Sequence, residues 1–352
     1  MVDSSRYGAS DLVGFASSLF VQVGLSAERA TTLAEILVEA DLIGHTTHGL
    51  KLLAPYLTEL ESGKMAKDGN PVVVSDNGAT LTWDGQYLPG VCLVVEAMEI
   101  AFERIKQHPV MTIAIRDSHH IACLAAFMKR ATDKGLFMLL AASDPNTGSV
   151  APFGGLEGLY SPNPLAAGIP TKGTPIIIDI SMSNTANGYI SQYQQAGKPM
   201  PGKWLLDNKG NPTDDPGVFS TEPPGTILPV GGIDLGYKGF ALGLLIEALT
   251  SALAGNGRSN PPGRWGSSVF LQVIDPEKMG GLDNFTREMQ WLVDASHQNK
   301  TRPGNPPVRL PGERGLKLRA EQLENGVELY PAIPPALQSL ADKYGIAMPE
   351  TI

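Results

Sequence analysis

Helical and strand-like apolar segments alternate between residues 90 and 142, and this alternation restricts the fold more than any other feature of the chain. Short runs rich in apolar or β-branched residues predict strands, and apolar residues at helical spacing predict the helices between them. The order is helix 91–106, strand 110–115, helix 121–134 and strand 137–142, with further strands predicted at 176–178 and 268–274. Strands that alternate with helices are typical of an α/β core, and we predict a mixed sheet.

Helices are also predicted in the segments that precede and follow this core in the sequence. Ser26 can cap a helix that Gly44 ends, and another helix is expected over residues 50–62. A last helix near residues 335–344 could pack back on the first ones. A hairpin turn is predicted at Asn77-Gly78, between two strand-like runs.

We therefore expect three segments. The first is a helical region, 1–75, and the second is a cofactor-binding core, 76–315, whose Pro- and Gly-rich stretch 196–228 forms a flap. The third, 316–352, is expected to pack on the amino-terminal helices.

The composition excludes several classes of function. The 352 residues carry 27 Lys and Arg against 36 Asp and Glu, a net charge of −9, which argues against binding to nucleic acid or to an anionic membrane. The two cysteines, Cys92 and Cys123, are in no framework spacing and are expected to be free thiols. No signal peptide or membrane-spanning run is apparent, so a cytoplasmic location is predicted.

Four of the six histidines form two tight groups, His45 with His48 and His119 with His120. Histidine titrates near neutral pH, so such groups suggest proton transfer or metal binding. No Asp, Glu or Cys near His45-x-x-His48 completes a metal motif, and both rings could instead cap helix ends. We favour a general acid at His48, at the start of the next helix. The second group follows a strand, where ligands bind in open α/β sheets.

The common nucleotide-binding motifs are missing. No G-x-G-x-x-G follows a predicted strand, and neither a phosphate loop nor a G-x-S-x-G elbow is present. The glycine-rich stretch 229–239 precedes a predicted helix, 240–254, and could offer backbone N–H groups and Lys238 to an anion, or could simply be a turn. The stretch 309–314 has the same two interpretations.

Together these segments resemble the malate/L-lactate dehydrogenase family of the sulfolactate dehydrogenase type, which is not a Rossmann fold. The resemblance covers most of the chain and depends on the order of its motifs, each of which is weak alone. The motifs are Gly44-His45-Thr46-Thr47-His48-Gly49, Ser118-x-His120, Val150–Gly155, Asn163–Leu165, Ile178–Ser181, Asp214–Pro216, Leu228–Gly232, Gly236–Gly239 and Leu310–Glu313.

The resemblance implies a homodimeric, NAD- or NADP-dependent oxidoreductase that transfers hydride between nicotinamide and a 2-oxo or 2-hydroxy acid, or a related cyclic imine acid. It implies acid/base roles for His48 and His120, and it places Thr47, His45 and Leu52 at the substrate. Its cofactor contacts correspond to Ile178, Asp179, Ile180, Ser181, Tyr237, Lys238, Gly312, Glu313 and Arg314. No metal ligand is predicted.

One departure from the family pattern concerns the substrate. Many members carry an arginine four residues after the second motif histidine, suited to a carboxylate, and here that residue is Leu52. Two alternatives to the oxidoreductase remain open from the residues alone: a histidine-metal hydrolase or lyase, and a relative that binds a metabolite without catalysis.

Overall fold

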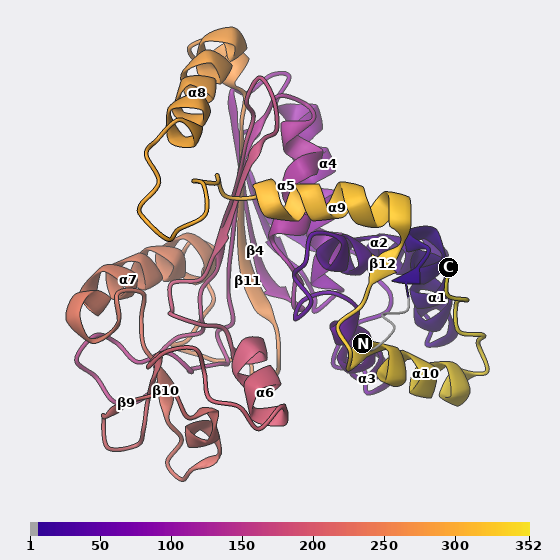
Figure 1. Cartoon of the computed structure of the whole chain (residues 1–352). Helices are drawn as coiled ribbons and strands as arrows, with labels where there is room; N and C mark the ends of the chain where they lie inside the picture. The colour runs from indigo at the N-terminus through magenta and orange to yellow at the C-terminus, as the bar shows by residue number, and fades with distance from the viewer. Residues whose placement is uncertain (1–5) are drawn as a thin grey trace.

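A mixed sheet of seven strands forms the centre of the protein, whose computed structural model describes residues 6–352 (Figure 1). The strands, in chain order, are β2 (Val72–Asp76), β3 (Thr80–Asp84), β4 (Val110–Ser118), β5 (Phe137–Ser143), β6 (Leu165–Ile169), β7 (Ile176–Ile180) and β11 (Ser267–Ile274). They lie in the order β2-β3-β4-β11-β5-β6-β7. Only β3 and β4 pair in parallel among these neighbours, so the sheet is mixed, as the sequence predicted.

Two layers of helices cover this sheet. Successive side chains of a strand point to opposite faces, so strands that are apolar throughout need a cover on each face. The helices are α4 (Gly90–Arg104), α5 (Ala125–Thr132) and α7 (Gly232–Glu247), which continues as a π-helical turn, η3 (Ala248–Ala252). Val269 and Leu271 of β11 belong to the main core with α4 and α5, whereas Phe270 packs with Ile246 of α7 in a separate cluster. The middle of the sheet, at β11, is therefore buried on both faces, whereas the edge strand β2 is exposed.

The amino- and carboxyl-terminal segments form one helical layer beside the sheet, at the right of Figure 1. Its elements are β1 (Arg6–Tyr7), α1 (Ala9–Gln22), α2 (Ala27–Leu42), η1 (Leu50–Leu52), α3 (Leu53–Glu61), α9 (Glu313–Asn325), β12 (Val327–Glu328) and α10 (Ile333–Tyr344). Ser26 caps α2 by accepting a hydrogen bond from the Arg29 N–H, as predicted. Tyr344 of α10 donates a hydrogen bond to Glu61 at the end of α3, so the last helix does pack back on the first ones.

Residues 196–228, predicted as a flap, contain three very short strands that form their own sheet. They belong to a lobe made of α6 (Asn187–Gln195), β8 (Leu205–Leu206), β9 (Pro212–Thr213), η2 (Pro216–Ser220) and β10 (Thr226–Ile227). Two further elements, η4 (Pro276–Lys278) and α8 (Leu282–His297), follow β11. The division of the chain into segments 1–75, 76–315 and 316–352 stays a prediction, and residues 1–5 of the first lie outside the described residues.

Three helix boundaries differ from the sequence predictions. The helix expected from residue 121 begins at Ala125, and the helix expected from residue 240 begins at Gly232. Thr47 and His48 begin no helix, because they lie in a turn before η1. The dipole argument for a neutral His48 is therefore wrong. None of the helices formed by residues 6–352 is long and apolar enough to span a bilayer.

Candidate active site

The loop that carries His45 and His48 is held by a buried carboxyl group. Asp41, near the end of α2, accepts a 2.7 Å hydrogen bond from the Leu50 N–H and is 1 % exposed. A Cβ atom on Gly49 would lie within 2.6 Å of both Asp41 carboxylate oxygens, so only glycine fits there. Burial raises the pKa of Asp41 to about 7. Gln322 of α9 caps the carboxyl end of α2, because its side-chain amide donates hydrogen bonds to the Asp41 and Leu42 carbonyls.

His48 lines a cavity of about 420 Å³, which we call cavity 1. The Nδ1 atom of His48 lies 2.7 Å from the Thr47 hydroxyl, which leaves Nε2 as the nitrogen without a protein partner among residues 6–352. Burial, with smaller contributions from the nearby charges of His45 and Lys51, lowers the pKa of His48 to about 4. A neutral imidazole therefore predominates at neutral pH, for a different reason from the one the sequence suggested.

His120 lies beside His48 in the same cavity, with ring centroids 5.9 Å apart. Its Nδ1 atom lies 2.7 Å from the Tyr56 hydroxyl and accepts a 3.3 Å hydrogen bond from the Ala122 N–H. A ring nitrogen that accepts from a backbone N–H is unprotonated, so the neutral ring carries its proton on Nε2. Burial, followed by the neighbouring rings of His48 and His119, lowers the pKa of His120 well below its usual range.

The other histidine of the doublet has a structural environment. His119 is fully buried, its Nε2 atom lies 3.4 Å from a Glu59 carboxylate oxygen, and its ring meets Trp265 edge-on. Trp265 also packs against His120, with ring centroids 4.9 Å apart. The two neighbouring histidines therefore have different environments. His119 packs in the core, and His120 lines cavity 1.

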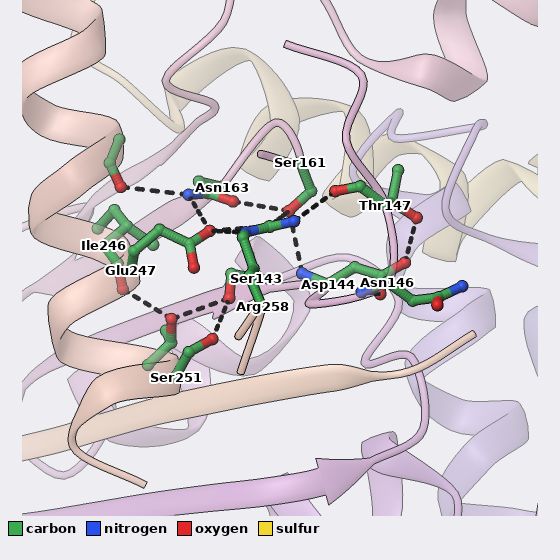
Figure 2. Close-up of polar contacts among 12 residues, drawn as sticks. Ser143, Asp144, Asn146, Thr147, Ser161, Asn163, Ile246, Glu247, Ser251 and Arg258 are labelled. Carbon is green, nitrogen blue, oxygen red and sulfur yellow. Dashed lines mark hydrogen bonds and ion pairs between the residues drawn. The ribbon is translucent and has the colours of Figure 1, made fainter. Parts of the chain in front are cut away.

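A polar network holds the part of the wall of cavity 1 formed by Asp144, Thr147 and Ser161, and Figure 2 shows its contacts. Arg258 is at its centre, since it pairs with Glu247 at 2.8 Å and donates to the Thr147 carbonyl at 2.6 Å. Ser161 accepts from both Arg258 and the Asp144 N–H. Burial raises the pKa of Asp144, while its hydrogen bond from the Thr147 hydroxyl acts in the opposite direction. The network fixes this wall to the end of α7.

A second cavity of about 390 Å³, cavity 2, adjoins the first, since His45 and Asp179 line both. It is also lined by Ile178, Ile180, Gly312 and Arg314, all predicted as cofactor contacts. Gly312 adopts φ +90° and precedes the first turn of α9, where the Glu313 N–H donates to the Leu310 carbonyl and the next two N–H groups, of Arg314 and Gly315, are free to bind an anion. Arg314 is exposed in this turn. An anionic ligand that extends over both cavities therefore finds suitable donors in cavity 2.

The remaining predicted cofactor residues are placed differently. Ser181 lines cavity 1, whereas Glu313 accepts hydrogen bonds from His297 and from the Leu310 N–H and so organises its own loop. Tyr237 and Lys238 are exposed on α7 and line neither cavity. Thr47, His45 and Leu52, predicted at the substrate, all line cavity 1.

Comparison with known proteins identifies the family. The family model described as malate/L-lactate dehydrogenase matches residues 8–338. The chain belongs to the malate/L-lactate dehydrogenase family. It is 32 % identical to an L-lactate dehydrogenase of Cupriavidus necator over 330 residues, which cover 92 % of this chain and 93 % of the relative.

Two further members of the family support the same assignment. A (2R)-3-sulfolactate dehydrogenase (NADP(+)) of Chromohalobacter salexigens is 30 % identical, with 91 % of this chain and 93 % of that protein covered. The crystal structure of Δ1-piperideine-2-carboxylate reductase from Pseudomonas syringae superposes with a TM-score of 0.82 at 29 % identity, covering 96 % of this chain and 99 % of the other. The predicted family and fold are confirmed, and the chain is an enzyme of the oxidoreductase class.

Three residues outside the family motifs support the site and were not predicted. Tyr56 and Trp265 contact His120, and Arg258 holds the polar network. Tyr56 could have been found, because it follows Leu52 by one helical turn in the sequence and so could share its face. Trp265 and Arg258 come from a loop before β11, and only the tertiary fold brings Trp265 to the cavity and Arg258 to the polar network behind its wall.

Proposed function

We propose that this enzyme catalyses reversible, nicotinamide-dependent reduction of a 2-oxo acid to a 2-hydroxy acid, or of the related cyclic imine acid. The observation that carries the proposal is the pair of neutral histidines, His48 and His120, side by side in a cavity that adjoins a second, anion-compatible one. Relatives named as lactate and sulfolactate dehydrogenases and as a piperideine carboxylate reductase support this reaction class.

NAD or NADP would be held across the two cavities. The Arg314 side chain and the backbone N–H groups of Arg314 and Gly315 suit its phosphates, and Asp179 and Ser181 lie toward cavity 1, where the nicotinamide would meet the substrate. When bound, the cofactor supplies or accepts hydride at its nicotinamide ring. Glu313, Tyr237 and Lys238 stay predicted contacts, and none of the three lines either cavity.

The two histidines take different roles. His120, with its proton on Nε2, donates a hydrogen bond that orients the substrate oxygen or nitrogen and stabilises negative charge there. His48 exchanges the proton at Nε2, because Thr47 binds its other nitrogen and can accept from it. Its lowered pKa makes His48 a competent base at neutral pH when the hydroxy acid is oxidised.

The substrate end of the cavity favours an apolar substituent. Leu52 lines cavity 1, and among residues 6–352 no lysine or arginine does so. A second carboxylate on the substrate would therefore find no arginine of the same chain with which to form a bidentate ion pair. We therefore propose better activity on 2-oxo acids with an apolar substituent, or on a cyclic imine acid, than on oxaloacetate.

A homodimer in the cytoplasm is also proposed, with no nucleic-acid or membrane partner. The surface of α7 supports the dimer, because it exposes large apolar side chains around more than half of the helix, and their contact with water is unfavourable. About half of each of these side chains is accessible: Ile233, Leu235, Tyr237, Leu242, Leu244 and Leu245.

A panel of 2-oxo acids assayed with NADH and NADPH tests the proposed reaction. Oxidation of either cofactor in the presence of an apolar 2-oxo acid or cyclic imine acid is expected. Cofactor binding without turnover of any member of the panel would favour the metabolite-binding alternative instead. Turnover that needs an added metal ion and no cofactor would favour the hydrolase or lyase.

A further inference from the structure

Three side chains of different chemistry meet on the wall between the two cavities. His45 comes from the loop after α2, Cys123 from the segment between β4 and α5, and Asp179 from β7. One ligand atom from each lies within 4.8 Å of the other two. The sequence offered no partner for a metal at His45-x-x-His48, whereas the fold supplies two for His45 from distant segments.

The separations suit a small tetrahedral cation. The Cys123 Sγ atom lies 3.7 Å from Asp179 Oδ2. A zinc ion about 2.3 Å from sulfur and about 2.0 Å from oxygen separates those two ligands by about 3.5 Å. The Asp179 carboxylate is already oriented by a 2.8 Å hydrogen bond from the Ala125 N–H. Among residues 6–352 no hydrogen bond holds the half-buried His45 ring, so it is free to turn toward the ion.

The charge of the cavity favours a cation as well. Asp144 and Asp179 line cavity 1, and no lysine or arginine of the described residues joins them there. The chain as a whole carries a net charge of −9. A divalent cation that enters cavity 1 therefore meets carboxylates and imidazoles on its walls, while Lys51 and Arg258 act on it only from behind them.

We propose that His45, Cys123 and Asp179 bind a soft divalent cation of the zinc class, with its fourth position open to cavity 1. Thiolate and imidazole ligands select zinc-like ions over magnesium or calcium, which prefer oxygen. Binding releases the thiol proton of Cys123 to solvent and leaves a thiolate–metal bond, so no electron is transferred.

The bound cation regulates the enzyme by excluding the dinucleotide. His45 and Asp179 line both cavities, so the ion lies on the path that a ligand spanning them must take. This step rests on the proposed function, because it requires that the nicotinamide cofactor occupy both cavities. Zinc is then an inhibitor that competes with NAD(P)H.

Cobalt titration of the metal-free enzyme tests the site itself, because a thiolate ligand gives cobalt an intense charge-transfer band in the near ultraviolet. Wild type and the matched control Cys92→Ser should both show this band, and Cys123→Ser should lack it and bind zinc at least about 100-fold more weakly. His45→Ala provides a second test should Cys123→Ser not fold, and is expected to weaken zinc binding similarly. Absence of the band in wild type, or its persistence in Cys123→Ser, would overturn the site.

A second titration tests the competition. NAD(P)H binding to the metal-free enzyme, followed by tryptophan fluorescence, should weaken in proportion to added zinc in wild type and hardly change in His45→Ala. NAD(P)H that binds wild type equally well at saturating zinc overturns the competition. Failure of the metal-free enzyme to bind either dinucleotide would instead overturn the proposed function and leave the cobalt result standing.

Discussion

The hydroxyl group of Tyr56 should matter for catalysis although it need not touch the substrate. It lies 2.7 Å from Nδ1 of His120, and with the Ala122 N–H it holds the His120 proton on Nε2. Tyr56 is fully buried, so Tyr56→Phe leaves Nδ1 with one long hydrogen bond of 3.3 Å and no water to replace the lost one. A net loss of about 1–2 kcal/mol of transition-state stabilisation, from the hydrogen bond that orients His120, corresponds to a roughly 5- to 30-fold fall in kcat.

Steady-state kinetics in both directions would measure this effect. We expect kcat to fall while KM for NAD(P)H stays near its wild-type value, because cavity 2 is untouched. The control is Tyr344→Phe, which removes a hydroxyl that bonds Glu61 on the surface and should leave both constants unchanged. A wild-type kcat in Tyr56→Phe, with the fold intact by circular dichroism, would refute the positioning role.

Three further outcomes follow from the same structure. Arg258→Met leaves Glu247 half-buried without its partner and should lower the free energy of unfolding by about 3 kcal/mol, read from urea melts, and raise KM for the substrate; an unchanged melt would contradict this. Asp41 has its pKa raised from 3.8 to about 7, so wild type should lose stability relative to Asp41→Asn as the pH rises from about 4 to about 7, by at most about 4 kcal/mol, and parallel melting curves would contradict this. Leu52→Arg should shift the ratio of kcat/KM toward oxaloacetate by about tenfold, and an unchanged ratio would contradict contact between Leu52 and the substrate.

The sequence predicted the layered core because its strands are local. β4 begins with the largely apolar run 110–115 and β5 with the apolar run 137–142, and these local patterns do not depend on distant residues. Strand order could not be read in the same way. β11 comes last in the chain among the strands of the sheet yet lies between β4 and β5, a placement that only long-range packing decides.

The start of α7 shows why glycine misled the sequence analysis. Gly236 and Gly239 were interpreted as part of a turn, but both lie inside the helix. A Cβ atom on Gly239 would come within 2.3 Å of the Val230 backbone, and one on Gly236 would crowd Phe153. These glycines permit close packing of a helix against the preceding segment, and sequence alone does not distinguish that need from a turn.

The candidate site was predictable for those residues that lie in a local sequence motif. His48 and His120 were named from local patterns, and the structure brings them together at a ring separation of 5.9 Å. The supporting residues were not predictable, since Trp265 reaches the cavity, and Arg258 the polar network behind its wall, from a loop far along the chain. Sequence proximity identified the two histidines that we propose as reacting groups, and tertiary structure identified the residues that contact them.

Chemical rescue of His48→Ala tests the central proposal most directly. Turnover of the preferred 2-oxo acid, followed by NAD(P)H absorbance, should fall by roughly 10²- to 10⁴-fold in this variant, and added imidazole should restore part of it. His108→Ala is the matched control, because His108 lines neither cavity; His297 would be a poorer one, since it bonds Glu313 near cavity 2. Near-normal turnover in His48→Ala would contradict proton exchange at this histidine.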